Sequence, residues 1–116
     1  MIVDTSITQV EPDITVFAIS GRLTLGNTLM GIERSILKLI TDGCKKLVVD
    51  VAGLDYIDSA GIGTLIGCFG QMEQAGGTLC IAGARDGVAQ SFGIVHLDRV
   101  LGLHDDLPGA CATFNS

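Results

Sequence analysis

Residues 47–63 of the chain read LVVDVAGLDYIDSAGIG, and this stretch decides the fold. It opens with a nearly continuous apolar run over residues 47–51, interrupted by Asp50, which is typical of a central strand covered on both faces. A loop over residues 52–58 is expected next, followed by a helix over residues 59–74 that stops before a pair of glycines. A buried strand that leads directly into a helix is the repeating unit of an α/β sheet.

The remainder of the chain alternates between strand and helix patterns in the same way. Gly21 is expected to end the second strand, and Asn27 or Thr28 to cap the helix that follows it. The order β-β-α-β-α-β-α-β-α predicts an α/β fold in one domain over residues 1–116, a mixed sheet of four to five strands covered by about four helices. The other expected strands cover residues 2–10, 14–20, 79–82 and 100–103, and the other expected helices cover residues 27–42, 87–92 and 105–113.

The composition is apolar and rich in glycine. Of the 116 residues, 16 are glycine, 47% are hydrophobic and only 17% are charged, which excludes a disordered chain. The net charge is −6 and the seven basic residues are scattered, so no nucleic-acid partner is expected. The four cysteines form no C-x-x-C pair and have apolar neighbours, which indicates small core residues in a reducing compartment and no metal site.

The sequence carries no signal for export or membrane insertion. Its amino terminus, Met-Ile-Val-Asp, lacks both a basic region and a long apolar run. The longest uncharged stretch, residues 59–72, is interrupted by glycines and is too short to cross a bilayer. We therefore expect a cytoplasmic protein without a membrane partner.

Motifs of catalytic and cofactor-binding sites are incomplete. Gly61 and Gly63 begin a G-x-G-x-x-G pattern, but Ile66 occupies the third glycine position. There is no G-x-S-x-G elbow, and the S-x-x-K match at residues 35–38 falls inside an amphipathic helix without its partner motifs. His96 lies in an apolar stretch and is expected to be structural. We expect no enzymatic activity, no catalytic residue and no cofactor.

Ser59 stands where the loop passes into the helix over residues 59–74, and two interpretations of it remain open. Its hydroxyl can cap the helix by accepting a backbone N–H. Alternatively, Ser59 is a modified serine, because a phosphate there would meet the free N–H groups of the helix start. The phosphate would also bring about 1.5 to 2 negative charges beside Asp55 and Asp58. The N–H groups of the helix start favour the phosphate, whereas the two carboxylates oppose it, and this balance suits a switch.

The same helix carries a stripe of glycines beside its apolar stripe. Gly63, Gly67 and Gly70 share a face, and each costs roughly 0.8–1 kcal/mol of helix stability relative to alanine. Two explanations remain open: close packing against a neighbouring helix or strand, and a smooth surface on which a partner lies. The stripe expected to face the core consists of Ile62, Leu65, Ile66, Phe69 and Met72.

Residues 57–63, Ile-Asp-Ser-Ala-Gly-Ile-Gly, resemble the signature of the STAS domain family when taken with the strand that precedes them. The resemblance includes Leu54 and Asp55 upstream and the strand up to Gly83 downstream. The predicted order of elements is also that of the family, so the resemblance covers the whole chain. The most similar branch is that of the bacterial anti-sigma factor antagonists.

This resemblance implies a partner-switching role without enzymatic activity. The unphosphorylated domain would bind an anti-sigma factor that is a serine kinase, and so release a sigma factor. Phosphorylation of Ser59 would end the binding, and a serine phosphatase would restore it. The residues expected to bind the partner are Thr24, Leu25, Gly26, Asn27, Asp58, Ser59, Ala60, Gly61, Ile62, Gly63 and Gly67.

One position departs from the family pattern. Many members have an aspartate where this sequence has Thr24, so kinase recognition or partner identity is expected to differ. Ala60 takes the place of a second serine and leaves Ser59 as the single obvious acceptor. The resemblance also leaves an alternative open: a constitutive STAS scaffold in a stressosome-like or lipid-transport assembly, in which Ser59 is never phosphorylated.

Overall fold

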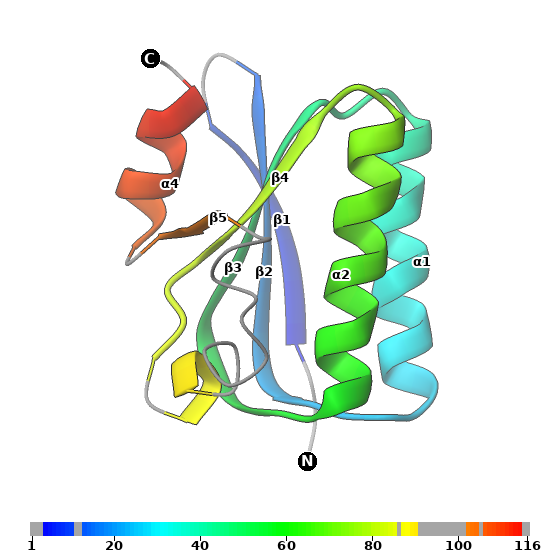
Figure 1. Cartoon of the computed structure of the whole chain (residues 1–116), viewed down its shortest axis with the longest axis vertical. Helices are drawn as coiled ribbons and strands as arrows, with labels where there is room; N and C mark the ends of the chain where they lie inside the picture. Colours follow the sequence, from blue (N-terminus) through cyan, green and yellow to red (C-terminus); the bar gives the residue numbers. More distant parts are fainter. Residues whose placement is uncertain (1–3, 11–12, 86, 91–101, 105, 115–116) are drawn as a thin grey trace.

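The structure, a computed structural model, describes residues 4–10, 13–85, 87–90, 102–104 and 106–114. Its centre is a five-stranded sheet in the order β1-β2-β3-β4-β5 (Figure 1). β1 and β2 pair antiparallel, whereas β2, β3, β4 and β5 run parallel to one another. The strands are β1 (Asp4–Val10), β2 (Ile14–Leu23), β3 (Lys46–Ile57), β4 (Thr78–Ala82) and β5 (Gly102–His104).

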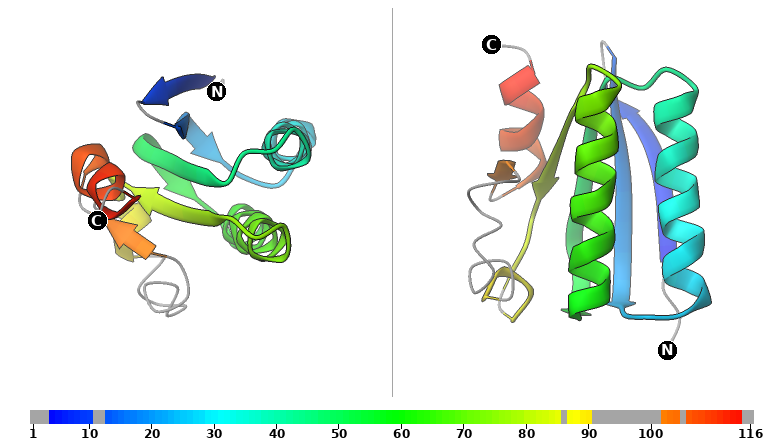
Figure 2. Two further views of the ribbon diagram at one scale, coloured as in Figure 1. Left: turned by 90° about the horizontal axis from the view of Figure 1, so that it is seen from above. Right: turned by 45° about the vertical axis from the view of Figure 1, so that its right-hand side comes forward.

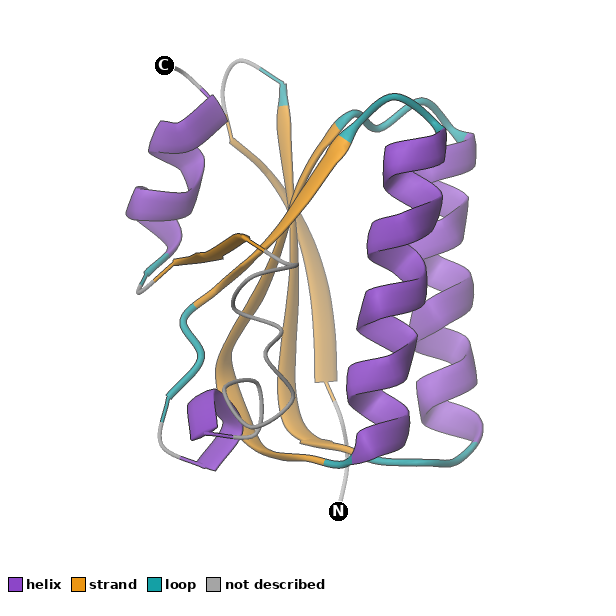
Figure 3. Ribbon diagram, viewed as in Figure 1, coloured by secondary structure: helices purple, strands orange, loops and turns teal. Residues whose placement is uncertain are grey.

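Helices cover both faces of the sheet. α1 (Asn27–Thr41) and α2 (Ser59–Gln74) lie side by side on one face, and α4 (Leu107–Phe114) lies on the other (Figures 2 and 3). A short helical segment covers residues 87–90. Because α1 connects β2 to β3 and α2 connects β3 to β4, both helices begin at the end of the sheet where these parallel strands finish. The predicted mixed α/β architecture is confirmed.

The sheet has a buried core on each face, and the central strand β3 contributes to both. Val49 belongs to the larger core beneath α1 and α2, and Val48 belongs to the smaller core beneath α4. This arrangement explains why residues 47–51 form a nearly continuous apolar run, interrupted by Asp50, rather than an alternating one.

Strands β2 and β3 are both longer than the sequence predicted. β2 passes through Gly21, where φ is +99°, and reaches Leu23. β3 continues to Ile57 through the stretch that was expected to form a loop. Parallel pairing of Leu23 with Ile57 extends both strands, with register shifts near Gly21. Each strand supplies hydrogen-bond partners for the other, and this tertiary pairing overrides the tendency of glycine to end a strand.

The predicted bounds of α2 agree with the structure, whereas the predicted N-cap residue of α1 does not. α2 spans Ser59–Gln74 as expected, and Gly43 adopts a φ of +104° just after the C-cap of α1. The expected cap of α1 by Asn27 or Thr28 is wrong. Gly26 is the N-cap residue, and no side chain makes a capping hydrogen bond there.

The cysteines are free thiols with different degrees of burial. Cys68 and Cys80 are buried, as expected of small core residues, whereas Cys44 and Cys111 are half-buried. Burial is the main cause that raises the pKa of the Cys68 and Cys80 thiols to about 11, so both remain protonated at neutral pH.

Some expectations fall outside the described residues. These are the expected strand residues 2–3 and 100–101, the expected helix residues 91–92 and 105, and His96. Among the helices of the described ranges, none has the length and hydropathy that crossing a membrane requires.

Candidate partner-binding site

Asp58 joins the start of α2 to the loop between β2 and α1. It is the N-cap residue of α2, and its Oδ1 accepts a hydrogen bond of 2.8 Å from the backbone N–H of Gly61. Its Oδ2 accepts a second hydrogen bond of 2.9 Å from the backbone N–H of Leu25. One carboxylate therefore ties the first turn of α2 to the loop at Leu25, which precedes Asp58 by 33 residues in the sequence.

These hydrogen bonds keep Asp58 negatively charged. The N–H of Gly61, and then that of Leu25, lower the pKa of the carboxyl group below its ordinary value of 3.8. Partial burial acts in the opposite direction but does not reverse the shift. At neutral pH the first turn of α2 thus begins beside a full negative charge.

Ser59 is the first residue of α2, and it is exposed. The interpretation of Ser59 as the helix cap is wrong, because the Asp58 carboxylate accepts the N–H that a serine cap would have accepted. Within the described part of the chain, no hydrogen bond engages the Ser59 hydroxyl. The side chain is therefore available to a partner or a modifying enzyme.

Gly61 is enclosed where the first turn of α2 meets the end of β2. A Cβ atom at this position would lie 2.7 Å from the carbonyl oxygen of Leu23 and 2.8 Å from Cγ1 of Ile57. The same Leu23 carbonyl accepts a 3.2 Å hydrogen bond from the N–H of Asp58. Only glycine lets α2 begin this close to the strand.

The outer face of α2 is open. A Cβ atom built on Gly63, Gly67 or Gly70 would have no atom of the described residues within 4 Å, apart from its own helix and chain neighbours. Close packing against another described element therefore does not explain these glycines. Ile66 lies on this face and is 37% exposed, although it was expected in the core, and Cys68 is buried on the inner side instead. We refer to Gly63, Ile66, Gly67 and Gly70 as the outer face.

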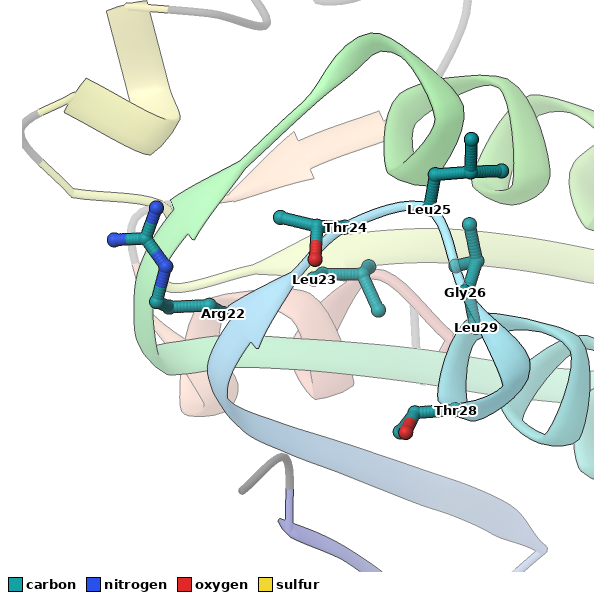
Figure 4. A pocket seen from close by; sticks show the side chains of 7 residues that line it. All are labelled: Arg22, Leu23, Thr24, Leu25, Gly26, Thr28 and Leu29. Atoms are coloured by element: carbon teal, nitrogen blue, oxygen red, sulfur yellow. The ribbon is translucent and has the colours of Figure 1, made fainter. Parts of the chain in front are cut away.

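The loop residues expected to bind a partner lie at the same end of the molecule. Thr24 is half-buried, while Leu25, Gly26 and Asn27 are exposed. Thr24 lines a hollow whose opposite sides carry Arg22 and Leu25 (Figure 4). The Arg22 guanidinium lies 4.4 Å from the centre of the Tyr56 ring, in a cation–π contact.

The structure brings the expected loop residues and the first turn of α2 to one end of the molecule, whereas Gly67 lies about two turns further along α2. Of the residues at the start of α2, Gly61 and Ile62 are buried and Ala60 is half-buried. Sequence reasoning missed Met30, Glu33 and Thr64, which line a groove between α1 and α2 with Leu25 and Ala60. The available signal was Met30, a large apolar residue outside the apolar stripe of its helix.

The sequence of the chain was compared with those of known domain families. The sequence model of the STAS domain matches residues 5–110. The chain belongs to the STAS domain family. The match includes the strand that leads to Asp58, the whole of α2 and most of the sheet.

Solved STAS structures have the same fold. A putative anti-sigma factor antagonist from Thermotoga maritima superposes with a TM-score of 0.88 at 16% identity, covering 97% of this chain and 95% of that one. RsbS from Moorella thermoacetica, in a variant with a serine replaced by glutamate, gives a TM-score of 0.80 at 25% identity, covering 96% and 94%. The phosphorylated Bacillus cell fate determinant SpoIIAA gives 0.69 at 18% identity, covering 86% and 90%.

Proposed function

We propose that this STAS domain is an anti-sigma factor antagonist whose binding to an anti-sigma factor serine kinase is switched by phosphorylation of Ser59. The unphosphorylated form binds the kinase and frees a sigma factor in the cytoplasm, and a serine phosphatase restores that form. The observation that carries the proposal is the exposed Ser59 hydroxyl at the first turn of α2, next to the Asp58 carboxylate. The domain acts as a binding module and performs no chemistry itself.

A phosphate at Ser59 would strongly change the local charge. It would add about 1.5 to 2 negative charges next to Asp58, whose carboxylate is ionised at neutral pH. Asp58 already accepts the hydrogen bond from Gly61, so it competes with the phosphate for the N–H groups of the first turn. The new charge would remain facing solvent and any bound partner. Burying it in an interface is unfavourable, and this favours release of the partner.

The surroundings of Ser59 suit a reversible protein interface. No residue from Ser59 to Met72 is charged, and the outer face of α2 has no Cβ atoms at its glycines. A partner backbone can therefore approach this part of α2 closely without desolvating a charge between Ser59 and Met72. Among related folds, SpoIIAA is known in a phosphorylated form and RsbS with a glutamate in place of a serine, which supports a phosphorylated serine as the control point.

The test uses the serine kinase anti-sigma factors encoded in the same genome, each purified and mixed with this protein. Ser59→Ala should bind one of them as tightly as the wild type does, whereas Ser59→Asp should lose binding by about a hundredfold or more. Incubation with that kinase and ATP should add one phosphate by intact mass, and peptide mapping should place it on Ser59.

Ser35→Ala is the matched control for the labelling experiment, because Ser35 is also an exposed helical serine, with its hydroxyl donating to the Gly31 carbonyl. This variant should accept phosphate as the wild type does. Label on any residue other than Ser59, or a kinase that binds but transfers no phosphate, would contradict the switch and favour the constitutive scaffold.

A further inference from the structure

The groove between α1 and α2 is continuous with the Ser59 end of the molecule. It has a volume of about 270 Å³ and is walled by Met30 and Glu33 of α1, by Ala60 and Thr64 of α2, and by Leu25 of the loop. Ala60 follows Ser59 directly in the chain, so the groove opens beside the proposed phosphorylation site. Residues of both helices and of the connecting loop thus form a single concave surface.

Two large apolar side chains of this groove face solvent. Leu25 is 79% exposed and Met30 is 56% exposed, the two highest values among the large hydrophobic residues of the described ranges. The backbone of Leu25 is also held in place, since its N–H donates to the Asp58 carboxylate. An exposed leucine on a fixed backbone, beside an exposed methionine, suits a surface that receives an apolar side chain from a partner protein.

Glu33 is the only charged residue among the described residues that line the groove. Glu33 lies near α2, because it lines the groove together with Ala60 and Thr64 of that helix. Asp58 lies at the Leu25 end of the same groove and carries a further negative charge. No cation of the described residues lines the groove, so a positively charged partner residue complements it.

We infer that this groove binds a segment of the anti-sigma kinase that inserts an apolar side chain between Leu25 and Met30 and pairs a lysine or arginine with Glu33. The inference rests on the proposed function, because it names the chemistry of the partner for that site. It adds Met30, Glu33 and Thr64 to the binding surface and gives Asp58 the role of a positioning residue for Leu25. Specificity for one kinase among several then depends on the groove, while Ser59 controls when the kinase binds.

The apolar part of the inference is tested by two matched substitutions. Met30→Glu should weaken binding of the purified kinase by about tenfold or more, because it places a charge in the apolar pocket of the interface. Ile7→Glu makes the same change at a residue of β1 that is 53% exposed, and it should alter the dissociation constant by less than about twofold. Equal effects of the two variants would overturn the groove as the docking site.

The proposed ion pair with Glu33 is tested by replacing one acidic residue at a time with lysine. Glu33→Lys should weaken binding about tenfold and should reduce the salt dependence of the association rate. Asp4→Lys changes the net charge by the same amount on an exposed residue of β1 outside the groove, and it should preserve the affinity to within about threefold. If both reversals weaken binding equally, the effect is one of overall charge and the pairing with Glu33 is refuted.

The outcomes separate this inference from the proposed function. If Ser59→Asp abolishes binding while Met30→Glu and Glu33→Lys leave it unchanged, the phosphorylation switch stands and the groove is wrong. If no kinase of the genome binds the wild-type protein, both proposals fail. Loss of binding by Met30→Glu counts for the groove when its circular dichroism spectrum and melting temperature match those of the wild type.

Discussion

The first turn of α2 and the outer face of the same helix use glycine for opposite reasons. In the first turn, Gly61 is surrounded by Leu23 and Ile57, and its N–H is held by Asp58. On the outer face, Gly63 and Gly67 have open space where a side chain would be. The first set of contacts fixes the position of the helix, whereas the second region carries a cost in helix stability that no described intramolecular contact offsets. A residue type alone therefore does not reveal whether it serves the fold or the surface.

Gly61→Ala tests this comparison with the largest expected change in stability. The added methyl would have to displace the Leu23 carbonyl or the Ile57 side chain, because it would lie 2.7 and 2.8 Å from them. We expect a loss of about 3 kcal/mol in the free energy of unfolding, measured by urea titration. A loss below about 1 kcal/mol would show that the start of α2 moves away from β2 at little cost.

Asp58→Asn should have a smaller, pH-dependent effect on stability. The amide cannot accept hydrogen bonds at both of its ends, so about 1 kcal/mol should be lost at pH 7. The pKa of Asp58 is lowered by folding, so the carboxylate adds stability above its unfolded value, close to 3.8, and loses it as pH falls through the folded value. The difference between wild type and variant should therefore stay constant from about pH 7 to 5 and narrow below about pH 4.

Asp106→Asn provides the control for that measurement. The Asp106 side chain accepts a hydrogen bond of 2.8 Å at Oδ1 from the backbone N–H of Gly109, and an asparagine oxygen can accept the same hydrogen bond. Its cost should stay within a few tenths of a kcal/mol. If both variants cost the same, the second hydrogen bond from Leu25 to Asp58 contributes nothing measurable.

Gly67→Ala should have the smallest effect on the free energy of unfolding, and it should raise this free energy where the other substitutions lower it. The methyl meets open space, and alanine is the better helix former, so the protein should become more stable by about 0.5–1 kcal/mol. Binding of the kinase should weaken at the same time if the partner lies against this face. A destabilised Gly67→Ala protein would show that the glycine is packed after all, and that the outer face is not a free surface.

The sequence predicted the order of elements and the bounds of α2 because the signals there are local. A run of apolar residues at helical spacing and a glycine pair after it define α2 without reference to the rest of the chain. The extension of β2 and β3 could not be found in this way. The extension depends on pairing between Leu23 and Ile57, which are far apart in the sequence. Glycine is unfavourable in strands, so Gly21 and Gly53 indicated loops at these positions.

The site was predicted in its position but not in its internal contacts. The motif around Ser59 indicated where the surface lies, yet the sequence did not show that Asp58, rather than Ser59, caps the helix. Both residue types are good caps, and the fold decides between them: the Asp58 carboxylate accepts the N–H of Gly61. The place of Met30 and Glu33 in the groove was missed because it follows from the way α1 packs beside α2, which the pattern of one sequence does not specify.

The shared carboxylate of Asp58 also has a consequence for motion. The N–H groups of Leu25 and Gly61 bond to the two oxygens of one side chain, so a rotation of that side chain can break both bonds in a single event. The loop and the first turn of α2 are then released on the same timescale, although they belong to different crossover connections. Exchange of their amide protons with deuterium would follow one common opening rate, and a local fluctuation at Ser59 would be transmitted to Leu25 without any change in the sheet.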